Sequence, residues 1–267
     1  MKSTHKTYSS KTVFLIFGLV VILFSGALIT YFMKFRNETL MPRLSAFKAA
    51  LSGNWDTISP ILESSALHLE TTLPVGGTLF VASARGDQIE IAKKLLIKGA
   101  EINAQDERKR TALYWTVENN SYPFFKFLIE KGADLHIRDD QGDTVLLRSA
   151  YLGRTQFVKD LISHNVNVKQ EGQFGVTAAM MAASQGHSEI LTLLSQTPLP
   201  IDQSDRFGKT PLMYAAENGH LDAVKTLIQQ RANPALQTDT GKTALELAEL
   251  KNHPKVADWL KTLETSK

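Results

Sequence analysis

This chain of 267 residues lacks the residues that several kinds of chemistry need. It has no cysteine, so a disulfide framework, a thiolate metal site and a cysteine nucleophile are excluded. Its formal net charge is only +3, and basic and acidic residues are interleaved, without the concentrated basic stripe of nucleic-acid-binding proteins. It also lacks a phosphate-binding glycine loop, a nucleophile elbow and a His-Glu-x-x-His motif. We therefore expect neither a nucleic-acid partner nor an enzyme.

One long apolar run is present near the N-terminus. Residues 12–33 read TVFLIFGLVVILFSGALITYFM and carry no charge, whereas Lys11 precedes them and Lys34 follows. A helix of this length is about 33 Å long, which matches the thickness of the hydrocarbon core of a bilayer. The sequence therefore predicts one transmembrane helix, with a basic tail at 1–11 and a juxtamembrane linker at 34–43.

A cleaved signal peptide is the alternative interpretation of this run. The basic start and the small residues at 25–27 fit it. The apolar run continues through Ile29 and Phe32, however, so cleavage would leave an apolar N-terminus. We favour an uncleaved signal anchor, with cleavage and secretion as the alternative. Gly26 and Thr30 have small-xxx-small spacing, so a helix-mediated dimer is an alternative to the monomer that we expect.

The side of the membrane occupied by the rest of the chain depends on a few flanking charges. Three lysines and the terminal amine precede the run, and a similar number of basic residues follow it, so the positive-inside rule nearly ties. A short tail before a first apolar helix most often acts as a signal anchor. We expect a bacterial inner-membrane protein whose C-terminal part lies in the periplasm, and a cytoplasmic position is the alternative.

The remainder of the chain is repetitive. An apolar pair followed by Gly-Ala recurs, as in Leu95-Leu96 before Gly99-Ala100, and the copy TPLMYAAENGH at 210–220 parallels TAAMMAASQGH at 177–187. Threonine can cap a helix, and paired alanines let neighbouring helices approach closely. No such unit buries its apolar face alone, so stability must come from stacking. The clearest threonines recur every 33 residues, at Thr111, Thr144, Thr177, Thr210 and Thr243.

This pattern resembles the ankyrin repeat, whose first helix opens with T-P-L-H-x-A-A-x-x-G-H and whose period is 33. Two weaker copies lie upstream. One begins at Thr78, where Gly86 indicates an inserted residue between the helices, and the other begins at Leu44. The resemblance implies an all-α ankyrin-repeat solenoid over 44–267, with a degenerate first unit and a charged last unit as a cap. About seven units are expected, starting near 44, 78, 111, 144, 177, 210 and 243.

The histidines and paired carboxylates invite a catalytic interpretation. His187, His220 and His253 share one repeat position, however, so the repeat explains them, and units about 10 Å apart separate them too far for one metal ion. The acidic residues around Asp140 fall in a hairpin loop, where solvated turn residues are common. The ankyrin architecture also lacks a deep pocket for a small substrate. We expect no metal, no cofactor and no small-molecule substrate.

The resemblance implies a protein partner, held by the concave groove of hairpin tips and first helices. Phe174 and Phe207 share one loop position, and with Tyr151 and Arg206 they have the composition of a binding hot spot. The alternative is that each Phe folds back over its own hairpin. For Trp115 both a core position and a surface position remain as alternatives. The candidate contacts are Arg108, Arg110, Glu118, Asp140, Asp143, Tyr151, Phe174, Arg206, Phe207 and Lys209.

These observations predict a membrane-anchored, non-catalytic module that holds or neutralises a protein partner. An immunity or protective protein would have this layout. A scaffold or assembly factor for a membrane complex is one alternative, and a host-directed ankyrin effector is another.

Overall fold

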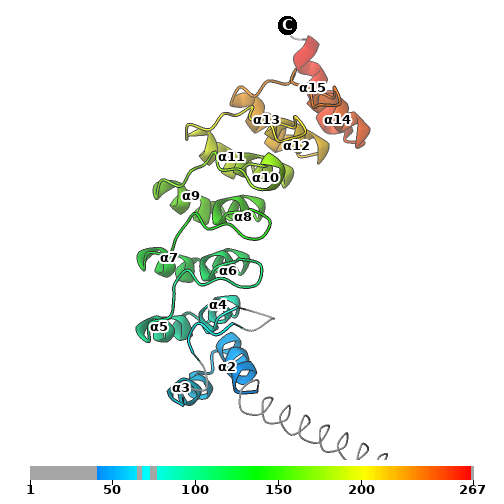
Figure 1. Cartoon of the computed structure of the whole chain (residues 1–267). Helices are drawn as coiled ribbons and strands as arrows, with labels where there is room; N and C mark the ends of the chain where they lie inside the picture. The colour runs from blue at the N-terminus through cyan, green and yellow to red at the C-terminus, as the bar shows by residue number, and fades with distance from the viewer. Residues whose placement is uncertain (1–40, 65–67, 73–76, 266–267) are drawn as a thin grey trace, which may run out of the picture.

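A computed structural model describes residues 41–64, 68–72 and 77–265 (Figure 1). The predicted span at 12–33 lies outside these residues. Within the described part, the helices pair into successive units of two antiparallel helices each. The pairs are α2 (Met41–Ser52) with α3 (Trp55–Glu63), α4 (Leu79–Arg85) with α5 (Ile89–Ile97), α6 (Ala112–Glu118) with α7 (Tyr122–Glu130), α8 (Val145–Tyr151) with α9 (Thr155–Ser163), α10 (Ala178–Ser184) with α11 (Ser188–Ser195), α12 (Pro211–Glu217) with α13 (Leu221–Gln229), and α14 (Ala244–Leu250) with α15 (Pro254–Thr265).

The units stack into a curved solenoid. The first helices, α2 to α14 in alternation, contact one another from unit to unit and form the inner column of the curve, while the second helices form the outer column (Figure 1). One continuous apolar core runs between the columns. Ala182, Ala183, Ala215 and Ala216 are fully buried there, because their small side chains let the first helices pack closely. The predicted all-α solenoid is confirmed for the described residues.

A threonine begins the first helix of each unit from the second onward. Each side chain accepts a hydrogen bond from a backbone N–H one turn into the helix, as Thr111 does from Tyr114 and Thr210 does from Met213, both at 3.4 Å. The bond satisfies a donor that the helix itself leaves unpaired. The capping threonines are Thr78, Thr111, Thr144, Thr177, Thr210 and Thr243.

The second unit keeps the 33-residue register, so the insertion that we predicted near Gly86 is wrong. The left-handed residue that ends its first helix is Asp87, with φ 56°, at the position where later units hold Asn120 or Gly153. Gly86 itself has φ −86°. A Cβ on Gly86 would lie 2.0 Å from the carbonyl oxygen of Leu51, so this glycine is needed for close packing of the first two units rather than for the turn.

Both ends of the stack differ from its middle. Helix α2 is already present at Met41, so residues 41–43, assigned from the sequence to a linker, are helical. Helix α15 extends for 12 residues, longer than the other second helices, and pairs Lys261 with Glu249 at 2.7 Å. No helix in the described ranges is long and apolar enough to cross a bilayer.

Candidate functional site: the concave face

The inner column exposes a regular set of side chains. In α6, α8, α10 and α12 only the fourth and seventh residues after the threonine escape burial, as Trp115 and Glu118 do in α6. Residues three apart lie on the same side of a helix, so the two rows face the inside of the curve together. We call these rows and the hairpin tips before each threonine the concave face. Its helical residues are Trp115, Glu118, Arg148, Tyr151, Met181, Ser184, Tyr214 and Glu217.

A buried aspartate shapes the hairpin tip in three units. Asp205 accepts hydrogen bonds through Oδ1 from the backbone N–H groups of Phe207 and Lys209, at 2.9 and 2.8 Å. Asp106 and Asp139 make the same pair of bonds in their units. Each carboxylate is at most 9% exposed, and it pairs donors that the tight turn would otherwise leave unsatisfied. The aspartate therefore fixes the direction of the tip.

The fifth unit has Gly172 at this position and forms a different turn. Without the carboxylate, its tip winds into a short 3₁₀ turn, η2 (Gln173–Gly175). Phe174 and Gly175 both have positive φ, 59° and 81°, and the N–H of Val176 donates to the carbonyl of Gln173 at 3.3 Å. A bulky residue in the left-handed region is strained by about 1–2 kcal/mol. Phe174 is thus held in a costly conformation at an exposed position.

Phe174 and Phe207 meet on the surface. Their ring centroids are 5.9 Å apart, and the side chains are 47% and 55% exposed. The backbone of the two tips is also joined, because the N–H of Arg206 donates to the carbonyl of Phe174 at 2.9 Å. The two rings contact each other across neighbouring units, while about half of each remains open to solvent. Tyr151, 37% exposed, lies beside the Arg148 guanidinium at 5.3 Å instead.

Three of the predicted charged contacts form ion pairs within the stack. Arg110 binds Asp106 at 3.0 Å, and Lys209 binds Glu217 at 2.6 Å. Glu118 accepts two bonds from Arg148 of the next unit, at 2.6 and 3.1 Å. Such pairing holds the side chains in place and lowers the charge that they offer to a partner. Of the other predicted charges at the tips, Arg108, Asp140 and Arg206 are exposed, and Asp143 is half-buried.

The row at the fourth position was missed by the sequence reasoning. Trp115 is half-buried there, between the guanidinium groups of Arg85 and Arg110 at 5.0 and 4.2 Å, and its Nε1–H donates to Asp106 at 3.1 Å. Trp115, which the sequence left open between core and surface, packs against the core with part of its ring and is partly exposed on the concave face. The sequence could have indicated this row, because its residues lie three positions before the row of Glu118 and therefore on the same side of the helix.

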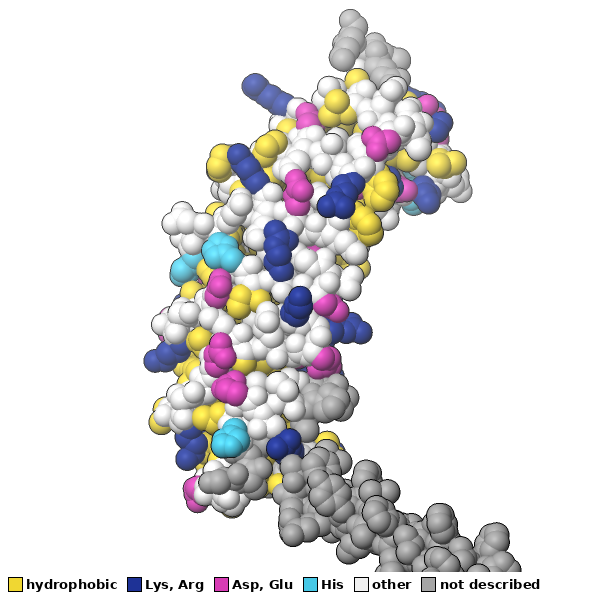
Figure 2. Space-filling model, viewed as in Figure 1, with side chains coloured by type: hydrophobic (Ala, Val, Ile, Leu, Met, Phe, Trp, Pro, Cys, Tyr) yellow, Lys and Arg dark blue, Asp and Glu magenta, His cyan; other side chains and the backbone are white. Residues whose placement is uncertain are grey.

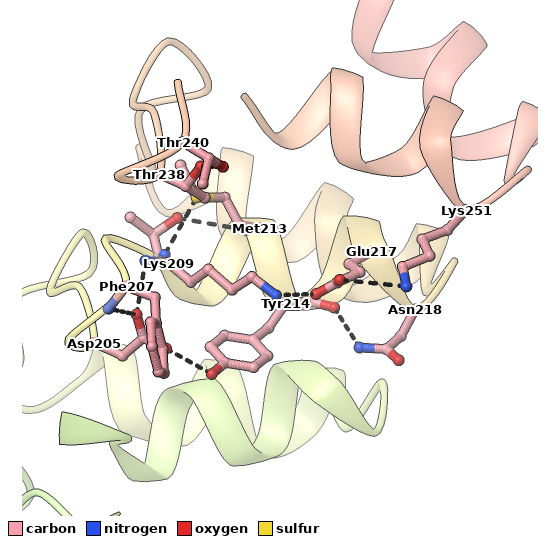
Figure 3. Close-up of polar contacts among 11 residues, drawn as sticks. Asp205, Phe207, Lys209, Met213, Tyr214, Glu217, Asn218, Thr238, Thr240 and Lys251 are labelled. Atoms are coloured by element: carbon pink, nitrogen blue, oxygen red, sulfur yellow. Dashed lines mark hydrogen bonds and ion pairs between the residues drawn. The ribbon is translucent and has the colours of Figure 1, made fainter. Parts of the chain in front are cut away.

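The sixth unit shows how the face is built from one network (Figure 3). The Tyr214 hydroxyl donates to Asp205 at 2.7 Å, the same carboxylate that shapes the tip carrying Phe207. Burial and this bond raise the pKa of Tyr214. Glu217 lies between Lys209 and Lys251, at 2.6 and 3.8 Å. Tip, helix and following unit are thereby tied together.

Charge is distributed unevenly along the face. At the tip and helix positions the third, fourth and sixth units all carry charged residues, whereas the fifth carries none. Its residues there are Gly172, Phe174, Val176, Met181, Ser184 and Gln185. Elsewhere both signs of charge are mixed, and Figure 2 shows them interspersed over the surface that it draws. The fifth unit is thus an uncharged stretch of the concave face, beside Phe207 and Tyr214 of the sixth.

Asp143 has the most perturbed carboxyl pKa on this face. Desolvation and the neighbouring Asp139 raise it from 3.8 to about 6, although Arg148 and Arg138 act in the opposite direction. A carboxyl whose pKa is higher when folded binds its proton more tightly in the folded state. The free energy of unfolding therefore falls as pH rises through the interval between these values, and the loss is complete above about pH 6.

We expect Asp143→Asn to be more stable than the parent at pH 7, by about 1 kcal/mol after allowance for solvent screening. The difference should vanish below about pH 3, where Asp143 is protonated in both states. Urea unfolding of the full-length protein across this pH range measures it. Asp140→Asn, at the exposed neighbouring carboxylate, is the control. A stability difference that does not change with pH would contradict the assignment.

The histidines of the repeat link neighbouring units. The Nε2–H of His187 donates to the carbonyl of Tyr151, and that of His220 donates to the carbonyl of Ser184, both at 3.0 Å. Each bond reaches back to the end of the preceding first helix, where carbonyls lack a helical partner. Within the described ranges no group of three or more potential metal ligands occurs.

Fold and face together define a helical repeat scaffold with a variable inner surface. A family model of ankyrin repeats in three copies matches the chain at 47–139, 79–172, 118–205, 146–238 and 179–266. The chain belongs to the ankyrin-repeat family. Such repeats are generally protein-binding modules and typically non-catalytic. Among curated proteins, a sequence search found no match for this chain.

Proposed function

We propose that this protein is anchored in a membrane through residues 12–33 and holds or neutralises one protein partner on its concave face. The apolar run of the sequence supports the anchor, and the family supports protein binding. The observation that carries the binding site is the exposed pair of Phe174 and Phe207 at the uncharged stretch of the concave face.

The strained backbone of Phe174 supports a binding role for its ring. Stability alone would favour Asn or Gly at this left-handed position, and solvent would favour a polar side chain. An outlier that persists against its conformational cost is a reason to look for function. A partner that covered both rings would bury two aromatic side chains where the uncharged stretch of the fifth unit meets the charged tip of the sixth. That arrangement is typical of a hot spot inside a polar rim.

The partner would therefore present an apolar side chain or cluster to the fifth and sixth units. Tyr151 and the tip residue Arg206 flank this centre. The ion pair of Lys209 with Glu217 holds the sixth unit in place, and those of Arg110 and Glu118 do the same in the third and fourth units. A preorganised surface loses less entropy on binding than a mobile one. The proposed role of the internally paired charges is to keep the face rigid.

The proposed biological role is immunity or protection at a bacterial inner membrane, with the repeats in the periplasm. A small anchored binder can capture a harmful protein where it reaches the membrane. Enzyme reporters fused to the C-terminus test the orientation, because a reporter that folds only outside the cytoplasm should be active. Activity of a cytoplasmic reporter alone would overturn the periplasmic assignment.

Phe174→Asn should weaken binding of the partner without lowering the stability of the fold. Asn-Gly is the preferred pair for two consecutive residues with positive φ, so the free energy of unfolding should stay the same or rise by up to about 1 kcal/mol. Affinity for the partner should nevertheless fall at least about tenfold, as for a hot-spot residue. The partner is captured from detergent extracts with the full-length protein, and titration calorimetry then compares the variants.

Gln229→Ala, on the exposed outer column, is the matched control and should leave the affinity unchanged. Phe207→Ala should lower it as Phe174→Asn does, because the two rings form one contact. Unchanged affinity in both Phe variants, with the fold intact, would place the binding site elsewhere.

A further inference from the structure

We propose that the outer surface of α5 and α7 rests on an anionic bilayer surface, so that the solenoid lies against the membrane by a face opposite to its binding face. This inference extends the membrane anchor of the proposed function. The contact is a shallow apolar groove of about 430 Å³, lined by Lys93, Leu96, Ile97, Phe127 and Lys131. We call it the lysine groove.

Ile97 is the most exposed large apolar residue among those that the structure describes, at 86%. It lies at the C-terminal end of α5, on the outer column. A single exposed apolar residue is ordinary in soluble proteins. Here, however, the same repeat position is polar in every later unit, where it holds Glu130, Ser163, Gln196, Gln229 and Thr262.

Lysines surround this apolar tip. The ammonium groups of Lys93 and Lys131 lie 5.7 and 6.0 Å from the ring centre of Phe127, and that of Lys94 lies 5.2 Å from the ring of Trp55 in the preceding unit. Lysine stems that cover apolar rings while their charged ends reach outward are suited to the boundary between lipid tails and headgroups.

The charge of this surface is concentrated. Residues 89–98 and 122–131 contain five lysines and only two glutamates, so these two segments carry a net charge of +3, as large as that of the whole chain. One of the glutamates, Glu90, pairs with Lys93 at 2.7 Å. Dark-blue side chains stand out from the lower left edge of Figure 2, where Figure 1 places α5 and α7. Such a surface attracts anionic headgroups over a distance of about a Debye length.

The length of chain before the described residues favours a membrane over an acidic protein as the occupant. Only residues 34–40 separate the predicted span from Met41, and seven extended residues reach at most about 25 Å. The units nearest to that point are the first three, which are the units that carry Trp55, Ile97 and Phe127. The groove therefore lies at the end of the solenoid that the anchor would bring to the headgroups.

The absence of cysteine makes a depth measurement direct. Ile97→Cys places a single labelling site in the full-length chain, and Gln229→Cys places one at the matched, exposed position four units further on. Each protein carries an environment-sensitive fluorophore and is reconstituted with vesicles of phosphatidylcholine, alone or with phosphatidylglycerol. Headgroup spin labels in the lipid and a water-soluble quencher report where the fluorophore lies. Glu130→Cys, in the next unit at the same position, gives a second depth if labelling at Ile97 perturbs folding.

We expect quenching by the lipid spin labels to be several-fold stronger at position 97 than at 229, and stronger with phosphatidylglycerol than without. Added salt, or Lys93→Gln with Lys131→Gln in the Ile97→Cys protein, should weaken it. A fluorophore at 97 that stays in water in anionic vesicles would overturn the inference. Extraction with alkaline carbonate tests the anchor separately. If carbonate removed the protein from the vesicles, the anchor would be refuted, whatever the depth of the fluorophore at position 97.

Discussion

Phe125→Ala should lower the free energy of unfolding by about 3–5 kcal/mol, the usual effect of truncating a fully buried phenylalanine. Phe125 in α7 is 0% exposed, and its ring centroid lies 4.6 Å from that of Phe157 in the next unit. The substitution removes apolar burial and leaves a cavity between two units. Because each unit is stabilised by its neighbours, the urea transition should also become broader as the two halves of the stack uncouple.

Phe127→Ala is the matched control on the same helix. Its ring is only partly buried, on the outer side of α7, so the loss should stay below about 1 kcal/mol. Equilibrium urea unfolding of the full-length proteins, followed by circular dichroism, measures both. Equal losses for the two variants would mean that the interface between the third and fourth units is not packed as described.

Asp205→Ala should lower the free energy of unfolding by about 2–4 kcal/mol, because a carboxylate that accepts three hydrogen bonds is lost. Two of the donors are backbone N–H groups of the tip, and the third is the Tyr214 hydroxyl, 2.7 Å away (Figure 3). A buried donor without a partner costs more than the bond itself contributed. The tip that carries Phe207 should also lose its protection against amide hydrogen exchange.

Two variants control this prediction. Asp140→Ala removes an exposed carboxylate from the tip of the fourth unit and should change stability by less than about 0.5 kcal/mol. Asp205→Asn keeps an oxygen acceptor for the tip and should fall between the two. If Asp205→Ala were as stable as Asp140→Ala, the tip would not depend on its buried carboxylate.

The candidate contacts were predicted from repeat position alone, and the structure divides them by environment. Phe174, Phe207 and Tyr151 are exposed, as a contact must be, whereas Arg110, Glu118 and Lys209 are held in ion pairs. Their role in binding stays a prediction. Repeat position could place the candidate contacts on one face, because the register is periodic. Whether a charged residue forms an ion pair depends on which side chain lies opposite it in the fold.

The sequence by itself determined the register, because a threonine cap, paired alanines and an apolar pair recur every 33 residues, and the resemblance to the ankyrin repeat implied the solenoid. The sequence interpretation was wrong in the second unit, where Gly86 suggested an inserted residue, whereas Asp87 ends the first helix in the 33-residue register. Only the tertiary structure decided that Phe174 takes a strained left-handed conformation and meets Phe207. That outcome depends on a carboxylate that Gly172 lacks and on a ring contributed by the next unit, and neither is visible within a single repeat.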